Sequence, residues 1–164
     1  MQIPASAVRA KCHSPLGLMH LVALDDRLIG VWFDAQAYQP DLSHVTVTMA
    51  NPVTDLTAEQ LGDYFAGRRQ RFELPTRFVF GTPFQQAVWN ALQEIPFGQR
   101  CSYLAIAAGL GKPTAARAVG AAVGRNPISV VIPCHRVLGA QGKLTGYAGG
   151  LDRKAALLRL EGLS

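Results

Sequence analysis

The feature that most constrains the fold is a change of pattern at Gly81. Before it, the apolar runs Leu18–Leu24 and Leu28–Phe33 have strand length and are separated by a polar turn. A further strand is expected around Val8–His13, ahead of the turn at Ser14–Gly17. Short apolar runs joined by tight turns predict an antiparallel meander. After Gly81 the pattern becomes one of short helices and glycine-bearing turns.

One helix is expected in the first part of the chain. Thr57–Gln60 has the form of a capping box, and apolar residues continue it as an amphipathic helix that ends near Gly67. Residues 68–81 form a basic and then irregular connector. We therefore predict two domains, residues 1–76 and residues 77–164. Hydrophobic residues make up 49% of the chain and charged residues 16%, which is enough for a substantial core.

The second part carries three helix patterns. The first opens on Thr82-Pro83-Phe84-Gln85, which offers a cap, a proline at the first helical position and a capping glutamine, and Gly98 closes it. The next two, Ser102–Gly109 and Pro113–Val123, are separated by the tight turn Gly111-Lys112. Two short helices joined by a glycine-bearing turn are typical of a helix-turn-helix.

The last of these helices consists almost wholly of small residues, apart from Arg117. Small side chains let a helix pack closely against a neighbouring helix, which is the commoner reason for them. They would also let the helix lie close to a DNA backbone or groove floor, so both readings stay open. The formal net charge of +5 favours polyanionic partners such as DNA.

The cysteines indicate a reducing environment. Cys12, Cys101 and Cys134 form no CxxC pair, which argues against a disulfide framework and against a cysteine-rich zinc site. The first residues contain no apolar stretch of signal-peptide length, and no segment approaches the roughly 20 apolar residues that span a bilayer. We expect a cytoplasmic protein with no membrane partner, no metal and no cofactor.

Cys134 and His135 are the strongest candidates for chemistry. A thiol is nucleophilic only as thiolate, and its ordinary pKa is about 8.5, so a nearby imidazole is the usual proton acceptor. Adjacent side chains on a helix do not face each other, so we expect a bridging water. Glu161 is a candidate to orient the imidazole. A lone Cys-His pair is more often an inert core feature, but Pro133 and the glycines that follow indicate an irregular backbone around a pocket.

These residues belong to a longer pattern. Pro133–Val137, preceded by Asn126-Pro127-Ile128 and followed by Gly146–Gly150, closely resembles the active-site signature of the O6-alkylguanine-DNA alkyltransferases. The resemblance runs in order from about residue 81 to residue 162. It implies an α+β protein, with a small N-terminal antiparallel β-sheet and helix of ribonuclease H-like type. A mainly helical C-terminal domain, with the helix-turn-helix and the active-site cysteine, would follow.

The resemblance implies a set of catalytic residues. Cys134 would accept the alkyl group after activation through water by His135, and Glu161 would complete the relay. Asn126 would hold the turn that leads into the active-site segment. Tyr103 would lie near the phosphate of the rotated nucleotide and help to neutralise the departing guanine.

The same resemblance implies a substrate pocket. Val137 and Ala148 would offer mainly backbone groups to the flipped guanine, Tyr147 would wall the pocket, and Gly149 would belong to the same substrate-binding segment. Two positions depart from the family pattern. Val123 stands where many members carry a polar residue, and Ala148 replaces a common serine or glycine. We expect these departures to bear on substrate range, and the core reaction to be kept.

The DNA contacts implied lie on the second helix of the helix-turn-helix. Arg117 would occupy the space that the flipped base leaves. Its small neighbours Ala116, Ala118 and Gly120 would let the helix enter the minor groove, which is about 6 Å wide. The partner would be double-stranded DNA containing O6-alkylguanine, bound with little sequence specificity. We expect a monomer in solution, and cooperative assembly on DNA is left open.

The predicted reaction is direct damage reversal. The alkyl group would pass once and irreversibly to Cys134 after the nucleotide is flipped, with O4-alkylthymine left open as a second substrate. One alternative is a non-catalytic helix-turn-helix protein that binds DNA or senses lesions. Another is a cysteine hydrolase that uses Cys134, His135 and Glu161 and turns over repeatedly.

Overall fold

The computed structural model describes residues 2–163. The chain divides into two compact units, one made of Met1–Phe80 with Pro127–Val131 and the other of Gly81–Asn126 with Ile132–Ser164. Strands dominate the first unit and helices the second, so the predicted α+β class is confirmed. No helix among the described residues has the length and apolarity to cross a membrane.

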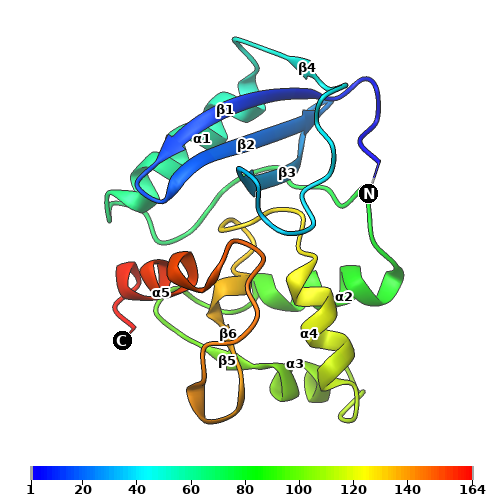
Figure 1. Ribbon diagram of the computed structural model, residues 1–164, viewed down its shortest axis with the longest axis vertical. Helices are drawn as coiled ribbons and strands as arrows, with labels where there is room; N and C mark the ends of the chain where they lie inside the picture. The colour runs from blue at the N-terminus through cyan, green and yellow to red at the C-terminus, as the bar shows by residue number, and fades with distance from the viewer. Residues whose placement is uncertain (1, 164) are drawn as a thin grey trace. The chain divides into compact units, whose positions relative to one another are not determined.

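The first unit is built on a four-stranded sheet with the order β3-β2-β1-β4. Strands β1 (Val8–Ser14), β2 (Gly17–Leu24) and β3 (Arg27–Phe33) pair antiparallel, as the spacing of apolar runs and turns predicted (Figure 1). Strand β4 (Thr46–Val47) pairs parallel to β1 and was not predicted. Both of its residues are exposed, so no apolar pattern marks it in the sequence.

Helix α1 (Pro52–Phe65) starts earlier than the predicted capping box at Thr57. The side chain of Asn51 caps it by accepting hydrogen bonds from the backbone N–H groups of Val53 and Thr54, at 3.0 and 3.1 Å. Thr57 lies inside the helix, and its hydroxyl donates to the Val53 carbonyl at 2.7 Å. The predicted start was wrong because Asn51 and the following proline supply the cap and the first helical position.

Helix α1 packs against strands β1, β2 and β3. The segment Pro127–Val131 extends the same unit alongside β3. The Val31 N–H donates to the Pro127 carbonyl, and the Ser129 N–H donates to the Val31 carbonyl, both at 2.9 Å. The chain that leads into Cys134 is therefore fixed by main-chain hydrogen bonds. One hydrophobic cluster of this unit contains Ile3, Ala7, Val22, Leu24, Ile29, Trp32, Leu42, Val45 and Phe80.

The second unit contains the helices α2 (Pro83–Gln93), α3 (Tyr103–Gly109) and α4 (Ala116–Gly124). The predicted capping box of α2 is confirmed, since Thr82 Oγ1 accepts from the Gln85 N–H and Gln85 Oε1 accepts from the Thr82 N–H. The predicted end at Gly98 was wrong. The helix stops before Ile95-Pro96, because a proline disfavours helical geometry in the preceding residue.

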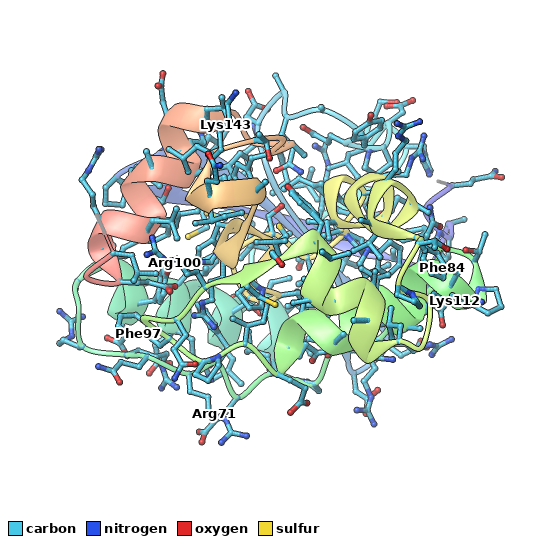
Figure 2. All side chains as sticks on the ribbon, turned by 90° about the horizontal axis from the view of Figure 1, so that it is seen from below. Arg71, Phe84, Phe97, Arg100, Lys112 and Lys143 are labelled. Atoms are coloured by element: carbon cyan, nitrogen blue, oxygen red, sulfur yellow. The ribbon has the colours of Figure 1, made fainter. Side chains whose placement is uncertain are left out.

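Helices α3 and α4 pack together as the predicted helix-turn-helix. Gly111 in the turn has a φ of 69°, a conformation that glycine adopts at no steric cost. Lys112, labelled in Figure 2, follows it. Helix α4 begins at Ala116 and not at the predicted Pro113, because the Ala115 N–H closes a turn on the Lys112 carbonyl before the helix starts.

The remaining elements of the second unit frame the candidate site. Strands β5 (Cys101–Ser102) and β6 (Val137–Leu138) form a parallel pair. Two short 3-10 helices, η1 (Cys134–Arg136) and η2 (Ala140–Gly142), flank β6. Helix α5 (Leu151–Leu160) closes the unit and packs against η1.

Candidate active site

Cys134 is the first residue of η1 and is 4% exposed. Its N–H donates to the Ile132 carbonyl at 2.8 Å, and its own carbonyl accepts from the Val137 N–H. Burial raises the pKa of the thiol, while a hydrogen bond from Asn126 and the charge of Lys154 act in the opposite direction. The sulfur is therefore held as a thiol until a base takes its proton.

Asn126 joins the end of the α4 segment to the sulfur. Its side-chain nitrogen Nδ2 donates to the Ile132 carbonyl at 2.8 Å and to Cys134 Sγ at 3.1 Å. The residue is 3% exposed, so neither bond competes with bulk water. The structure thus places Asn126 at the turn before the active-site segment and in direct contact with the nucleophile.

His135 and Glu161 form a fully buried pair. The distance from His135 Nε2 to Glu161 Oε1 is 2.8 Å, and neither side chain is exposed. Burial lowers the pKa of His135, although the hydrogen bond and the charge of Glu161 oppose this. The imidazole is therefore neutral near pH 7 and able to accept a proton. Its bond to Glu161 fixes the ring orientation.

Arg136 holds the other side of the Glu161 carboxylate. Arg136 Nε donates to Oε2 at 2.8 Å and Nη2 donates to Oε1 at 2.9 Å, a bidentate contact. The Gly98 N–H adds a longer bond to Oε2 at 3.3 Å. The guanidinium carbon lies 6.0 Å from the ring centroid of Phe97, which is labelled in Figure 2. Four donors thus hold a single buried carboxylate.

Tyr103 and Lys154 meet at one backbone oxygen. The Tyr103 hydroxyl donates to the Thr145 carbonyl at 3.2 Å, and Lys154 Nζ donates to the same carbonyl at 2.8 Å. Lys154 Nζ also donates to the Val137 carbonyl. These bonds hold the backbone at Thr145, in the glycine-rich loop of residues 143–150 that precedes α5.

Of the residues predicted to bind the substrate, one lies in β6 and the other three lie in the loop before α5. Val137 is buried in β6, directly after η1. Tyr147 and Ala148 are half-buried and Gly149 is buried, all in the loop that leads into α5. The structure therefore brings Val137 and this loop together through Lys154.

Helix α4 presents the residues predicted to contact DNA. Arg117 and Ala118 are exposed, while Ala116 and Gly120 are half-buried. A Cβ atom at Gly120 would lie 3.7 Å from the Tyr103 ring, an ordinary packing distance. The opposite face is buried and includes Val123, and Trp89 Nε1 donates to the Ala122 carbonyl at 2.8 Å. Small residues therefore surround one exposed arginine.

The sequence patterns did not indicate a role for two residues that hold the site. Arg136 lies within the active-site motif, and Lys154 lies outside it. A signal for Lys154 exists, since it lies at helical spacing from Leu151 and Leu158, where a charged residue interrupts an apolar face.

Comparison with known proteins identifies the family. Residues 83–163 match the model of the 6-O-methylguanine DNA methyltransferase DNA-binding domain, and residues 7–78 match that of the ribonuclease-like domain. A methylated-DNA–protein-cysteine methyltransferase of Mycolicibacterium paratuberculosis is 50% identical over 149 residues, which cover 90% of this chain and 88% of the relative. This chain belongs to the 6-O-methylguanine-DNA methyltransferase family.

Other methyltransferases of this family agree in sequence and structure. The relative from Salmonella typhimurium is 47% identical over 137 residues, covering 84% of this chain and 75% of its own. The structure of Mycobacterium tuberculosis OGT in complex with DNA superposes with a TM-score of 0.88 and 44% identity, covering 94% of this chain and 93% of that one. The methyltransferase of Pyrococcus kodakaraensis, with 24% identity and a TM-score of 0.64, shares the fold.

Proposed function

We propose that this chain repairs DNA by direct reversal, taking the alkyl group from O6-alkylguanine in duplex DNA onto Cys134. The observation that carries the proposal is the buried Cys134, bonded by Asn126 and followed directly by a His135–Glu161 pair. These residues lie in a chain 50% identical to a protein named for transfer from methylated DNA to a protein cysteine. Such a transfer needs a soft nucleophile whose proton can be removed.

The proton of Cys134 leaves first. His135 is adjacent in sequence, and its Nε2 is bonded to Glu161, so in this proposal Nδ1 is the ring nitrogen that takes the proton through one water molecule. Glu161 stabilises the imidazolium that forms, and two hydrogen bonds from Arg136 hold the carboxylate in place. The arrangement follows the logic of a nucleophile, a base and an orienting carboxylate.

The transfer is a displacement at saturated carbon. A bond forms between Cys134 Sγ and the alkyl carbon as the bond from that carbon to guanine O6 breaks. The electron pair stays on the purine, which takes up the proton that the thiol lost, so unmodified guanine is the product. The resulting thioether has no good leaving group for water, and each molecule therefore acts once.

The pocket residues have proposed roles that fit their positions. Val137 and Ala148 offer backbone groups to the extruded guanine, and Tyr147 and Gly149 form the wall next to them. Tyr103 stands beside this loop through its bond to the Thr145 carbonyl and would assist the departing purine. Ala148 lacks a hydroxyl, so recognition there depends on its backbone.

The proposed DNA surface is the exposed face of α4. Arg117 would fill the gap left by the flipped nucleotide. Ala116, Ala118 and Gly120 present little bulk around it, which suits entry into the narrow minor groove. Groove entry by small residues reads little sequence, and a repair protein needs to inspect any site.

Several wider statements are part of the same proposal. We propose that residues 1–76 and 77–164 act as separate domains, that the protein works as a monomer in the cytoplasm, and that O4-alkylthymine is a candidate second substrate. The reaction needs a free thiol at Cys134, and thiols stay reduced in the cytoplasm, which supports this location. The reaction requires neither a cofactor nor a metal, since the cysteine itself is the acceptor.

The experiment is incubation with a duplex that carries one O6-methylguanine, followed by mass spectrometry of the Cys134 peptide. The expected result is one methyl group per protein and a burst equal to the protein concentration. Cys134→Ala should abolish transfer, whereas Cys12→Ala, the matched control in the first unit, should keep it. Binding without methylation would instead support a lesion-sensing protein, and repeated turnover a hydrolase.

A further inference from the structure

Lys154 is a fully buried lysine in the second unit. Its exposed fraction is 0%, and it is the last of three consecutive charged residues in the first turn of α5, Asp152-Arg153-Lys154. Among residues 2–163 no carboxylate lies within ion-pair distance of its ammonium. Lysine is rarely buried completely without a paired charge, so this position needs a specific explanation.

The ammonium makes two hydrogen bonds, both to backbone carbonyls of the second unit. It donates to Val137 O at 2.5 Å and to Thr145 O at 2.8 Å. Val137 directly follows η1, and Thr145 lies in the loop of residues 143–150, which also contains Tyr147. Helix α5 runs beside β6 in Figure 1, which is how one side chain reaches both. Lys154 thus ties together the two backbone segments that flank the proposed guanine pocket.

The charge of Lys154 also acts on Cys134. It lowers the pKa of the thiol, and Cys134 in turn raises the pKa of Lys154, which burial brings to about 8. Arg136, the other buried lysine or arginine among the described residues, is already committed to Glu161 by two bonds. Among the described residues of this unit, Lys154 is therefore the buried cation that has no carboxylate within ion-pair distance.

We propose that Lys154 is a positioning residue for alkyl transfer, holding the Val137 and Thr145 carbonyls in place and acting as the counter-charge of the Cys134 thiolate. The part that concerns the pocket rests on the proposed alkyl transfer. The part that concerns the thiolate does not, because it can be measured without DNA. In the reaction Lys154 gives up no proton, since the thiol proton passes through His135 to the purine.

Several titratable and charged groups surround this position. Cys134 and His135 come from η1, Tyr103 comes from α3, and Arg136 and Glu161 form the adjoining ion pair. The charge of Lys154 lowers the pKa of His135 as well as that of Cys134. A variant without this charge therefore makes the thiol harder to ionise and the imidazole easier to protonate.

The first experiment measures the rate of Cys134 alkylation by iodoacetamide between pH 6 and pH 10, read by mass spectrometry of the Cys134 peptide. Lys154→Met should move the midpoint of the profile to higher pH and lower the rate at pH 7 on the order of 10-fold, the ratio that one pKa unit represents. Lys11→Met makes the same change at an exposed position of β1 and should leave the profile as in wild type. A wild-type profile in folded Lys154→Met protein would overturn the proposal.

The second experiment separates charge from hydrogen bonding. Lys154→Gln keeps two N–H donors and loses the charge. Lys154→Arg keeps the positive charge and also has N–H donors. The arginine variant should retain the wild-type midpoint and the glutamine variant should not. If Lys154→Met does not fold, the glutamine and arginine variants test the same claim. Equal midpoints in these two variants would contradict the role of Lys154 as the counter-charge of the thiolate.

The third experiment uses single-turnover transfer from an O6-methylguanine duplex. Lys154→Met should lower the limiting transfer rate by about 100-fold, the loss expected when pocket groups are misplaced. Its affinity for undamaged duplex should match wild type, because a buried side chain does not reach DNA. An unchanged limiting rate would refute the positioning role. If wild type itself fails to transfer methyl groups, the proposed function falls, while the iodoacetamide result still decides the role of Lys154 at the sulfur.

Discussion

The side-chain amide of Asn126 lies 3.1 Å from the sulfur of Cys134, and the same nitrogen donates to the Ile132 carbonyl at 2.8 Å. Asn126 comes two residues after the end of α4, the helix that exposes Arg117. The nucleophile and the proposed DNA-binding helix are therefore linked through one buried amide. A group added to the sulfur must displace this amide or be accommodated beside it.

Alkylation of Cys134 should for this reason destabilise the protein. The sulfur is 4% exposed, so an added methyl group enters a packed region, which typically costs about 1–3 kcal/mol. We expect the methylated protein, freed from DNA at high salt, to have a lower Tm than the unmodified protein. Cys134→Ala protein treated with the same methylated duplex provides the control, and its Tm should not move. Equal melting temperatures before and after methylation would contradict this link.

Glu161→Gln should weaken both stability and transfer. The carboxylate is the acceptor for His135 and for two Arg136 bonds, so the neutral amide leaves the buried guanidinium without its counter-charge. Breaking a buried ion pair from one side costs about 3–5 kcal/mol. Urea unfolding should show a loss of this size, and the single-turnover rate should fall. The matched change Glu59→Gln, at an exposed position of α1, should alter neither the free energy of unfolding nor the transfer rate. A Glu161→Gln protein with wild-type stability and activity would show that Glu161 takes no part in the proton relay.

Local patterns explain which parts of the fold the sequence predicted well. The strands β1 to β3 have strong apolar runs with clear turns, and the Thr82–Gln85 capping box depends only on residues within one turn of helix. The start of α1 failed because two local signals compete. The helix begins after Asn51, with Pro52 as its first residue. The Thr57 hydroxyl donates to the Val53 carbonyl in the preceding turn and does not cap the helix. Nothing in the local sequence decides between them.

Non-local contacts explain what the sequence did not predict. The pairing of Pro127–Val131 with β3 joins segments far apart in the chain and depends on main-chain bonds that any residue can make. The candidate site residues were named through a contiguous motif, but the partners of Lys154 are two backbone carbonyls, which leave no trace in residue types. The charge on an apolar helix face was the available signal, and it required knowing that α5 is buried on that face.

His135 should make the protein less stable as the pH falls. Its folded pKa lies below its ordinary value because of burial, whereas the unfolded chain has the ordinary value of about 6.5. Below pH 6.5 the unfolded state therefore binds a proton that the folded state does not, and the free energy of unfolding decreases. At pH 7.5 both states are neutral and this loss is absent.

The measurement is urea unfolding of wild type and His135→Gln at pH 7.5 and pH 5.5. The free energy of unfolding of wild type relative to the variant should decrease towards pH 5.5, because only wild type carries this titration. His13→Gln, an exposed strand position, should show no such difference. A relative stability that is constant or rises towards pH 5.5 would show that the folded pKa is not lowered.

Gly120→Ala distinguishes the two explanations for the small residues of α4. A Cβ atom at this position would lie 3.7 Å from the Tyr103 ring, so the methyl group fits the helix packing. Replacing a helical glycine by alanine typically stabilises by about 0.5–1 kcal/mol. If small residues serve helix packing alone, the variant should be more stable and bind DNA as wild type does. If this face enters the minor groove, stability should rise while duplex affinity falls.

We expect the second outcome, since Gly120 lies on the same helix as the exposed Arg117 and Ala118. Gly62→Ala in α1 is the matched control, because a Cβ atom there meets no atom within 4 Å. It should stabilise the protein by a similar amount without changing DNA binding. Duplex affinity measured by fluorescence anisotropy at fixed salt, together with urea unfolding of both variants, decides between the explanations. Equal affinities for Gly120→Ala and Gly62→Ala would place the DNA contact elsewhere on the second unit.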